Sequence, residues 1–405
     1  MKKCARIEIL VNQILITVFC TLITIITGIS DGARGVFLPL FSDAFALNET
    51  KANLIIMMSY IGNVIFLFIG GYFIDRMKKK TFLFIMICIW MSALLCYVLT
   101  ENYTLLIVGM IFSLGASTMI STTVNVITPL LFITPAFFTN FFNFTLGIGI
   151  SGVQKFGGKV ANDSLSTPES PADLSGWHIL NLMILVLAAV AVLLLLISRF
   201  PEENSTAPKK RENSFITVFK NPASLLLILI CGLYYMSEHG IQNVLTSYGS
   251  EYLGFTVEKA SMFLSLFFGG ITIGRLLFAP LVQKIGIMKS MTIFLSIASV
   301  LYISGILLEQ NGIWLLCLSG LAFSIIWPTT ILMIASFFTP STSGTAVGVI
   351  TSAATLFDVM FFAFFGKITE SVGYGVSIKI LPVSMALLFI FFILLKIKSK
   401  KSAAK

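Results

Sequence analysis

The feature that most constrains this chain is a series of apolar runs that recur from one end to the other and are almost free of charge. Each run is about 20 residues long, the length that a helix needs to cross the hydrocarbon core of a bilayer. Barrel strands need only about 10 residues, with alternating polarity, and the runs lack that alternation. Because every backbone amide inside a membrane must be bonded within the protein, the runs predict transmembrane helices.

The composition excludes a water-soluble globule. Charged residues make up 11% of the chain and hydrophobic residues 57%, whereas about a quarter of a soluble domain is charged. The net charge of +9 comes from basic residues in short loops between the runs. A nucleic-acid partner is therefore not expected, because such a partner requires a basic face or tail.

Twelve apolar runs predict an all-α membrane protein with twelve transmembrane helices in two pseudo-symmetric halves of six. The predicted spans are approximately 12–40, 52–74, 81–100, 104–128, 136–158, 178–198, 222–247, 260–282, 288–308, 312–335, 343–366 and 376–397.

A polar segment, 199–221, separates the sixth run from the seventh. It contains Pro201, Pro208 and the basic triplet Lys209-Lys210-Arg211, which lipid does not accommodate. The expected organisation is an N-terminal half, 1–198, a cytoplasmic linker, 199–221, and a C-terminal half, 222–405.

The distribution of lysine and arginine predicts the orientation. With the N-terminus inside and the side alternating at each span, 19 of the 27 basic residues lie on the inner side, as the positive-inside rule requires. We expect a multi-pass protein of the cell inner (plasma) membrane with both termini in the cytoplasm.

The two halves carry a trace of an internal repeat, which in transporters points to a site between the copies. A shift of 208 residues places Lys51 on Lys259. With one gap, Asp31 in the first span aligns with Glu238 in the seventh. Each half thus carries a carboxylate at a comparable depth in its first helix.

The run Gly71-Tyr72-Phe73-Ile74-Asp75-Arg76-Met77-Lys78-Lys79-Lys80 after the second span resembles the loop signature of the Major Facilitator Superfamily. It departs from that signature at Lys78, where glycine is usual, and the second copy, with Gln283, Lys284 and Gly286, is degenerate. The resemblance implies a gating role for Gly71, Asp75 and Arg76, through contacts made in one conformation only.

Patches in both halves resemble the fucose permease branch of this superfamily and its uncharacterised relatives. They are Asp31-Gly32-Ala33-Arg34-Gly35 with Leu38-Pro39, Tyr235-Met236-Ser237-Glu238, Phe268-Gly269-Gly270 with Gly274-Arg275-Leu276, and Ile326-Trp327-Pro328-Thr329. The resemblance implies sugar import with a proton, through acids in the first and fourth helices. The fourth span here has Asn125 and no acid, so Glu238 is the acid expected to stand in.

We therefore expect Asp31 and Glu238 to carry the coupled proton, because a carboxylate inside a span must face water or a partner. The residues expected to bind substrate are Arg34, Asn125, Tyr235, Gln242, Asn243 and Trp327. A purely structural role for the acids stays open, with Arg34 as the partner of Asp31 three residues along the helix.

Several side chains allow two interpretations. His239 adjoins Glu238 but points about 100° away around the helix, which favours a packed histidine over a proton relay. Tyr235 and Trp327 are suited to stacking on a sugar ring and equally to packing. For Asp358, a third carboxylate within a span, the sequence favours neither a functional nor a structural role.

These features predict a secondary transporter that moves a small polar solute, such as a sugar, with protons and by alternating access. The alternatives are a drug or metabolite efflux antiporter, and a transporter-like sensor that binds its ligand without turnover. No enzymatic activity, cofactor or metal is expected. The expected partners are a small-molecule substrate, protons and membrane lipid, and the protein is expected to be a monomer.

Overall fold

The computed structural model describes residues 2–74, 77–132, 135–200, 218, 220–339 and 342–403. Within these ranges twelve helices have 20 residues or more. They are α1 Lys2–Val36, α3 Glu49–Ile74, α4 Lys79–Val98, α5 Tyr103–Leu131, α6 Pro135–Asp163, α7 Ser175–Ile197, α9 Ser224–Glu251, α10 Val257–Ile285, α11 Ile287–Leu307, α12 Glu309–Ser336, α13 Ser343–Val372 and α15 Ile380–Ala403. Two short helices, α2 Leu38–Ala44 and α14 Tyr374–Ser377, complete the set.

The helices confirm the predicted all-α membrane fold. Eleven of those in the described ranges are long and apolar enough to cross a membrane. The remaining predicted span, 136–158, the fifth along the chain, lies in α6, which is equally long but richer in glycine and polar residues. Because α6 packs between α1 and α10, part of its surface faces protein and not lipid.

The first predicted span, 12–40, is wrong at its end. Helix α1 stops at Val36, and α2 begins at Leu38 with Pro39 in its first turn. Proline supplies no backbone N–H and is accepted at the start of a helix, not in its interior. The chain therefore bends at Phe37 before it enters α2.

The packing within each half follows the same pattern, so the fold is pseudo-symmetric. In the first half α1 packs on α6 and α7, α5 on α3 and α4, and α4 on α7. In the second half α9 packs on α13 and α15, α12 on α10 and α11, and α11 on α15. These are the same contacts with α1 replaced by α9 and each later helix by its counterpart. Most of the predicted linker 199–221 lies outside the described residues.

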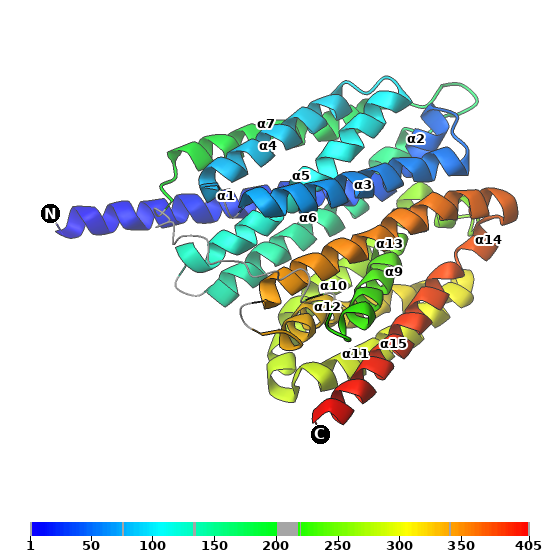
Figure 1. Cartoon of the computed structure of the whole chain (residues 1–405). Helices are drawn as coiled ribbons and strands as arrows, with labels where there is room; N and C mark the ends of the chain where they lie inside the picture. Colours follow the sequence, from blue (N-terminus) through cyan, green and yellow to red (C-terminus); the bar gives the residue numbers. More distant parts are fainter. Residues whose placement is uncertain are drawn as a thin grey trace.

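The halves meet along two equivalent seams, α6 against α10 and α3 against α13 (Figure 1). We call the end of the bundle that holds both chain termini the terminal end, and the opposite end, where α2 and α14 lie, the loop end. At the loop end Tyr374 donates to Glu49 at 2.7 Å, and Asn48 donates to Glu370 at 3.2 Å. These contacts join the two halves.

At the terminal end the described hydrogen bonds stay inside one half. Asn12 of the first half bonds Arg199, the residue that directly follows this half, and Lys396 bonds Thr292 within the second half. The helices of the two halves diverge toward this end in Figure 1. Among the described residues, the two halves are thus joined by polar contacts at the loop end and in the middle.

Candidate substrate and proton site

Polar side chains gather halfway along the bundle, where α1, α3, α5, α9 and α13 approach one another. Ser117, Glu238 and Asp358 each lie at the midpoint of their helix. Helices of this length span the bilayer, so their midpoints lie near its middle. A site between the two halves at this depth is where transporters with internal repeats bind their substrates.

In the first half, Asp31 and Arg34 each bond a serine from a neighbouring helix. Ser117 of α5 donates to the Asp31 carboxylate at 2.9 Å, and Arg34 donates through Nη1 to Ser59 of α3 at 2.9 Å. Arg34 Nε donates to the main-chain oxygen of Asp31 at 3.3 Å. The sequence left open an ion pair between Asp31 and Arg34. In the described structure the two side chains instead bond separate serines.

In the second half, His239 of α9 and Asp358 of α13 are directly paired. His239 Nδ1 lies 2.9 Å from Asp358 Oδ2. The Asp358 side chain is completely buried, whereas that of His239 is 23% exposed. The structure thus gives both residues a polar contact in the site, where the sequence had left their roles open.

A row of aromatic rings crosses the interface between the halves. Tyr60 of α3 stacks on His239 at 5.3 Å between ring centroids, and His239 stacks on Tyr235 at 4.9 Å. Tyr235 then contacts Trp327 of α12 at 4.9 Å. The Arg34 guanidinium lies 5.6 Å from the Tyr60 ring, within the range of a cation–π contact. Tyr60 therefore links the charged groups of both halves.

Two amide side chains of α9 also form hydrogen bonds with the first half. Gln242 donates to the main-chain oxygen of Asp31 at 3.3 Å, and Asn243 donates to the Tyr60 hydroxyl at 3.2 Å. The side-chain oxygen of Asn243 is buried and has no hydrogen-bond partner among the described residues. An amide oxygen left in this way is an acceptor available to a bound solute.

Glu238, the expected counterpart of Asp31, lies near the His239–Asp358 pair and not beside Asp31. Its side chain is 8% exposed and is within electrostatic range of Tyr234, as is Arg275 of α10. The residue of α9 within electrostatic range of Asp31 is His239. The roles of Asp31 and Glu238 in proton coupling stay predictions.

Two other predicted positions are not brought into this cluster. Asn125 is half-buried and follows Ser117 by eight residues, roughly 12 Å along α5 toward the terminal end. Of the gating motif, Gly71 lies in α3, where an added Cβ would meet no described atom within 4 Å, while Asp75 and Arg76 lie outside the described residues.

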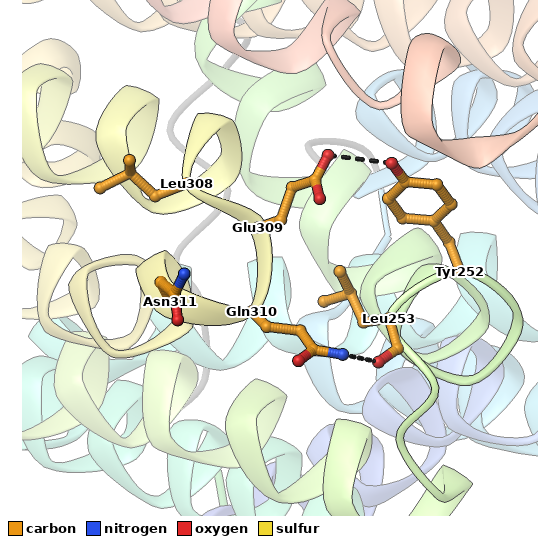
Figure 2. Close-up of a pocket in the computed structure, with 6 residues that line it drawn as sticks. All are labelled: Tyr252, Leu253, Leu308, Glu309, Gln310 and Asn311. Carbon is orange, nitrogen blue, oxygen red and sulfur yellow. Dashed lines mark hydrogen bonds between the residues drawn. The ribbon is translucent and has the colours of Figure 1, made fainter.

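Two surface hollows lie at the loop end, away from the central cluster. One, of about 420 Å³, is lined by Tyr252, Leu253 and 308–311 (Figure 2). The hydroxyl of Tyr252 donates to Glu309 at 2.9 Å, so these two lining residues are bonded to each other. His239 precedes the end of α9 by 12 residues, roughly 18 Å of helix, so this hollow is not part of the central site.

Sequence reasoning missed the serines and the tyrosine that hold the charged groups. Ser59, Tyr60 and Ser117 lie in the second and fourth spans, where nothing in the local pattern distinguishes them from other small polar or aromatic residues. Their positions at the midpoints of spans were the available signal, because a polar group at that depth needs a partner.

Among the described residues no cluster of ligands that could hold a metal is found.

Solved structures with the same fold cover almost the whole chain. The inward-open xylose transporter XylE from E. coli has a TM-score of 0.76 at 15% identity, over 94% of this chain and 95% of that one. A variant of the nucleoside transporter NupG has a TM-score of 0.74 at 15% identity, over 94% and 99%. A variant of the E. coli fucose:proton symporter FucP has a TM-score of 0.68 at 18% identity, over 95% and 99%.

A search of curated protein sequences finds no significant match. The family model of the Major Facilitator Superfamily matches residues 20–361, from the middle of α1 into α13 and across both halves. The match agrees with the twelve-helix, two-half architecture and with the structural likenesses. The chain therefore belongs to the Major Facilitator Superfamily of membrane transporters.

Proposed function

We propose that this protein is a secondary active transporter that moves a small polar solute together with protons by alternating access. The observation that carries the proposal is the polar network in mid-membrane that joins the halves through Tyr60, His239 and Asn243. Charged groups at this depth are costly, which makes them functional candidates by default. A network that crosses the interface is remade each time the halves rock.

The chemistry of the network suits a polyhydroxylated solute such as a sugar. Hydrogen-bonding groups of Arg34, Gln242 and Asn243 lie at the Tyr60 end of the ring row, which continues through His239 to Tyr235 and Trp327. Aromatic faces pack against the apolar face of a sugar ring while amides and guanidinium bond its hydroxyls. Solved neighbours that are named as xylose, fucose and nucleoside transporters support this class of solute. Asn125, nearer the terminal end, is proposed to contact the solute as it leaves the site toward the cytoplasm.

Asp31 is the acid of the first half that we assign to proton coupling, with Glu238 as its counterpart in the second. Asp31 is half-buried, bonded to Ser117 and within electrostatic range of Arg34. A solute that takes up hydrogen bonds from Arg34 changes the electrostatic environment of this carboxylate. Proton and solute binding thereby become linked.

The rocking motion needs a gate at each end. We propose that Gly71, Asp75 and Arg76 form the gate at the terminal end, and that the bonds of Glu49 and Glu370 form the gate at the loop end. With the termini in the cytoplasm of an inner-membrane protein, the described conformation is closed toward the outside. We propose that the protein works as a monomer, because each seam between the halves is complete within one chain.

Thermal unfolding of the purified protein against a panel of sugars, nucleosides, organic acids and drugs, at two pH values, tests this proposal. A ligand that binds the folded state stabilises it by RT ln(1 + [L]/Kd). We expect a sugar or nucleoside to raise the unfolding temperature by an amount that depends on pH. Stabilisation by drugs alone would favour the efflux antiporter, and no pH dependence would contradict proton coupling.

A further inference from the structure

One acid–base pair of the interface has no role in the function proposed so far. Asp358 is completely buried, and its Oδ2 lies 2.9 Å from His239 Nδ1. Its other oxygen, Oδ1, is buried without a hydrogen-bond partner among the described residues. A buried carboxylate with one unsatisfied oxygen depends on a nearby positive charge for compensation.

The groups around this pair show where that charge comes from. The His239–Asp358 pair has charged and titratable neighbours on three helices. They are Asp31 and Arg34 of α1, Tyr60 of α3, and Tyr235 and Glu238 of α9. Arg34 is the one permanent cation in this described set, against three carboxylates. A proton on His239 supplies a second positive charge, so the charge balance of the whole site depends on its protonation.

The geometry gives the proton a path to His239 and not directly to Asp358. The His239 side chain is 23% exposed while that of Asp358 is fully buried. Nδ1 is occupied by Asp358, whereas Nε2 makes no hydrogen bond within the described ranges. A hydrogen bond at one ring nitrogen fixes the tautomer and leaves the other nitrogen to exchange protons.

The pair also lies where alternating access can act on it. Tyr60 of the first half covers the His239 ring, and the hydroxyl of Tyr60 accepts a bond from Asn243, one turn further along α9. Movement of the first half away from the second at the loop end separates these groups. Such a movement uncovers His239 toward that end of the bundle.

We infer that His239 and Asp358 form a proton-binding pair for transport, with the proton exchanged at Nε2 of His239 and the ring held by Asp358. The inference rests on the proposed function and adds a proton site in the second half to Asp31 in the first. In the charged state both ring nitrogens carry hydrogen and Nδ1–H is donated to Asp358. Release of the Nε2 proton to water leaves a neutral ring that still donates Nδ1–H to the carboxylate.

A titration without any ligand tests proton binding directly, because the chain has only two histidines. The full-length protein with ¹⁵N-labelled imidazoles is followed by NMR in lipid nanodiscs between about pH 5 and pH 9. His178 Nε2 lies 2.9 Å from the main-chain oxygen of Thr100 and serves as the internal reference. We expect the His239 signal to pass between charged and neutral forms.

In Asp358→Asn we expect the midpoint of that His239 transition to move by about one pH unit or more, since a charge in direct contact shifts titration by this much. Thr355→Val is the control on α13, because Thr355 is buried and, among the described residues, bonds Thr351 alone. It is expected to leave the midpoint in place. A His239 that stays in one form, or a midpoint that Asp358→Asn leaves unmoved, overturns the inference.

Transport in proteoliposomes separates proton coupling from a structural role. For the solute that stabilises the wild type, His239→Gln and Asp358→Asn are expected to lose accumulation driven by a pH gradient by about tenfold or more. Exchange of internal for external solute is expected to persist, because exchange needs no net proton movement. Retained accumulation in both variants contradicts the inference. A wild type that moves no solute contradicts the proposed function instead, and the NMR titration then decides the pair alone.

Discussion

Three charged side chains in mid-membrane each bond a partner from another helix. Arg34 bonds Ser59, Asp31 bonds Ser117, and Asp358 bonds His239. Unpaired charges at this depth cost several kcal/mol, so these bonds stabilise the charged groups inside the membrane. The site is therefore held together by small polar residues that sequence patterns do not reveal.

Arg34→Lys tests the role of the guanidinium. Lysine keeps the charge but loses the planar fork that bonds Ser59 and the Asp31 main chain together. Loss of one hydrogen bond to a charged group, about 1.5 kcal/mol or more, should weaken solute binding about tenfold. Titration of the stabilising solute by thermal shift measures this, with Arg275→Lys, the other arginine within a span, as the control. Equal effects of the two substitutions would contradict a specific role for Arg34.

Tyr60→Phe tests the contact between the halves. The variant keeps the ring that stacks on His239 but removes the hydroxyl that accepts from Asn243. Loss of this hydrogen bond should destabilise the state that is closed at the loop end by about 1 kcal/mol. The ratio of open to closed molecules should then rise about fivefold. Distances between spin labels at the exposed positions Glu101 and Asn311, measured by double electron–electron resonance, report that ratio. An unchanged distance distribution would show that the hydroxyl does not hold the halves together.

At the residue scale, the sequence yields predictions of site acids and amides but not of which of them meet. Asp31 and Glu238 match in the repeat, yet the residue of α9 near Asp31 is His239, while Glu238 lies near His239, Asp358 and Tyr234. The rotation of α9 about its own axis decides this, and that rotation depends on packing with α13 and α15. Hydropathy along one helix contains no such information.

At the scale of helices, most of the architecture followed from hydropathy. Eleven predicted spans each coincide with one long helix, while the first is divided between α1 and α2, because in lipid the length of an apolar run fixes the length of the helix. The Pro39 bend was missed, since the residues on both sides of it are equally apolar. The contacts between the halves, α3 with α13 and α6 with α10, could be identified only from the structure.

Glycines set how closely helices of different halves approach. A Cβ at Gly366 of α13 would lie 2.6 Å from the Glu49 carbonyl oxygen of α3, and one at Gly35 of α1 would lie 2.2 Å from the Gln242 carbonyl oxygen of α9. Both distances are too short for a carbon–oxygen contact. Closure of the loop end thus depends on these two positions.

Gly366→Ala is therefore expected to favour molecules that are open at the loop end, with the Glu101–Asn311 label distance lengthened. Gly348→Ala, on the same helix, is the control because no atom of the described residues lies within 4 Å of its added Cβ. It is expected to leave the distances as in the wild type. If both alanines give the wild-type distribution, the seam does not control closure.

At the scale of the whole molecule, the two halves form one pseudo-symmetric unit whose contacts are asymmetric between its ends. Polar bonds from Glu49 and Glu370 join the halves at the loop end, whereas the described bonds at the terminal end stay within one half. Alternating access requires a second state in which this asymmetry is reversed. The mid-membrane network lies at the level about which the halves would rock.

Solute uptake by proteoliposomes under an imposed pH gradient is the most direct test of the proposed transport. The account predicts that a sugar or nucleoside accumulates above its external concentration when the outside is acidic. It also predicts that a protonophore collapses the accumulation and that Asp31→Asn abolishes it. Accumulation that is independent of the pH gradient, or binding of the solute without any uptake, would contradict proton-coupled transport by this protein.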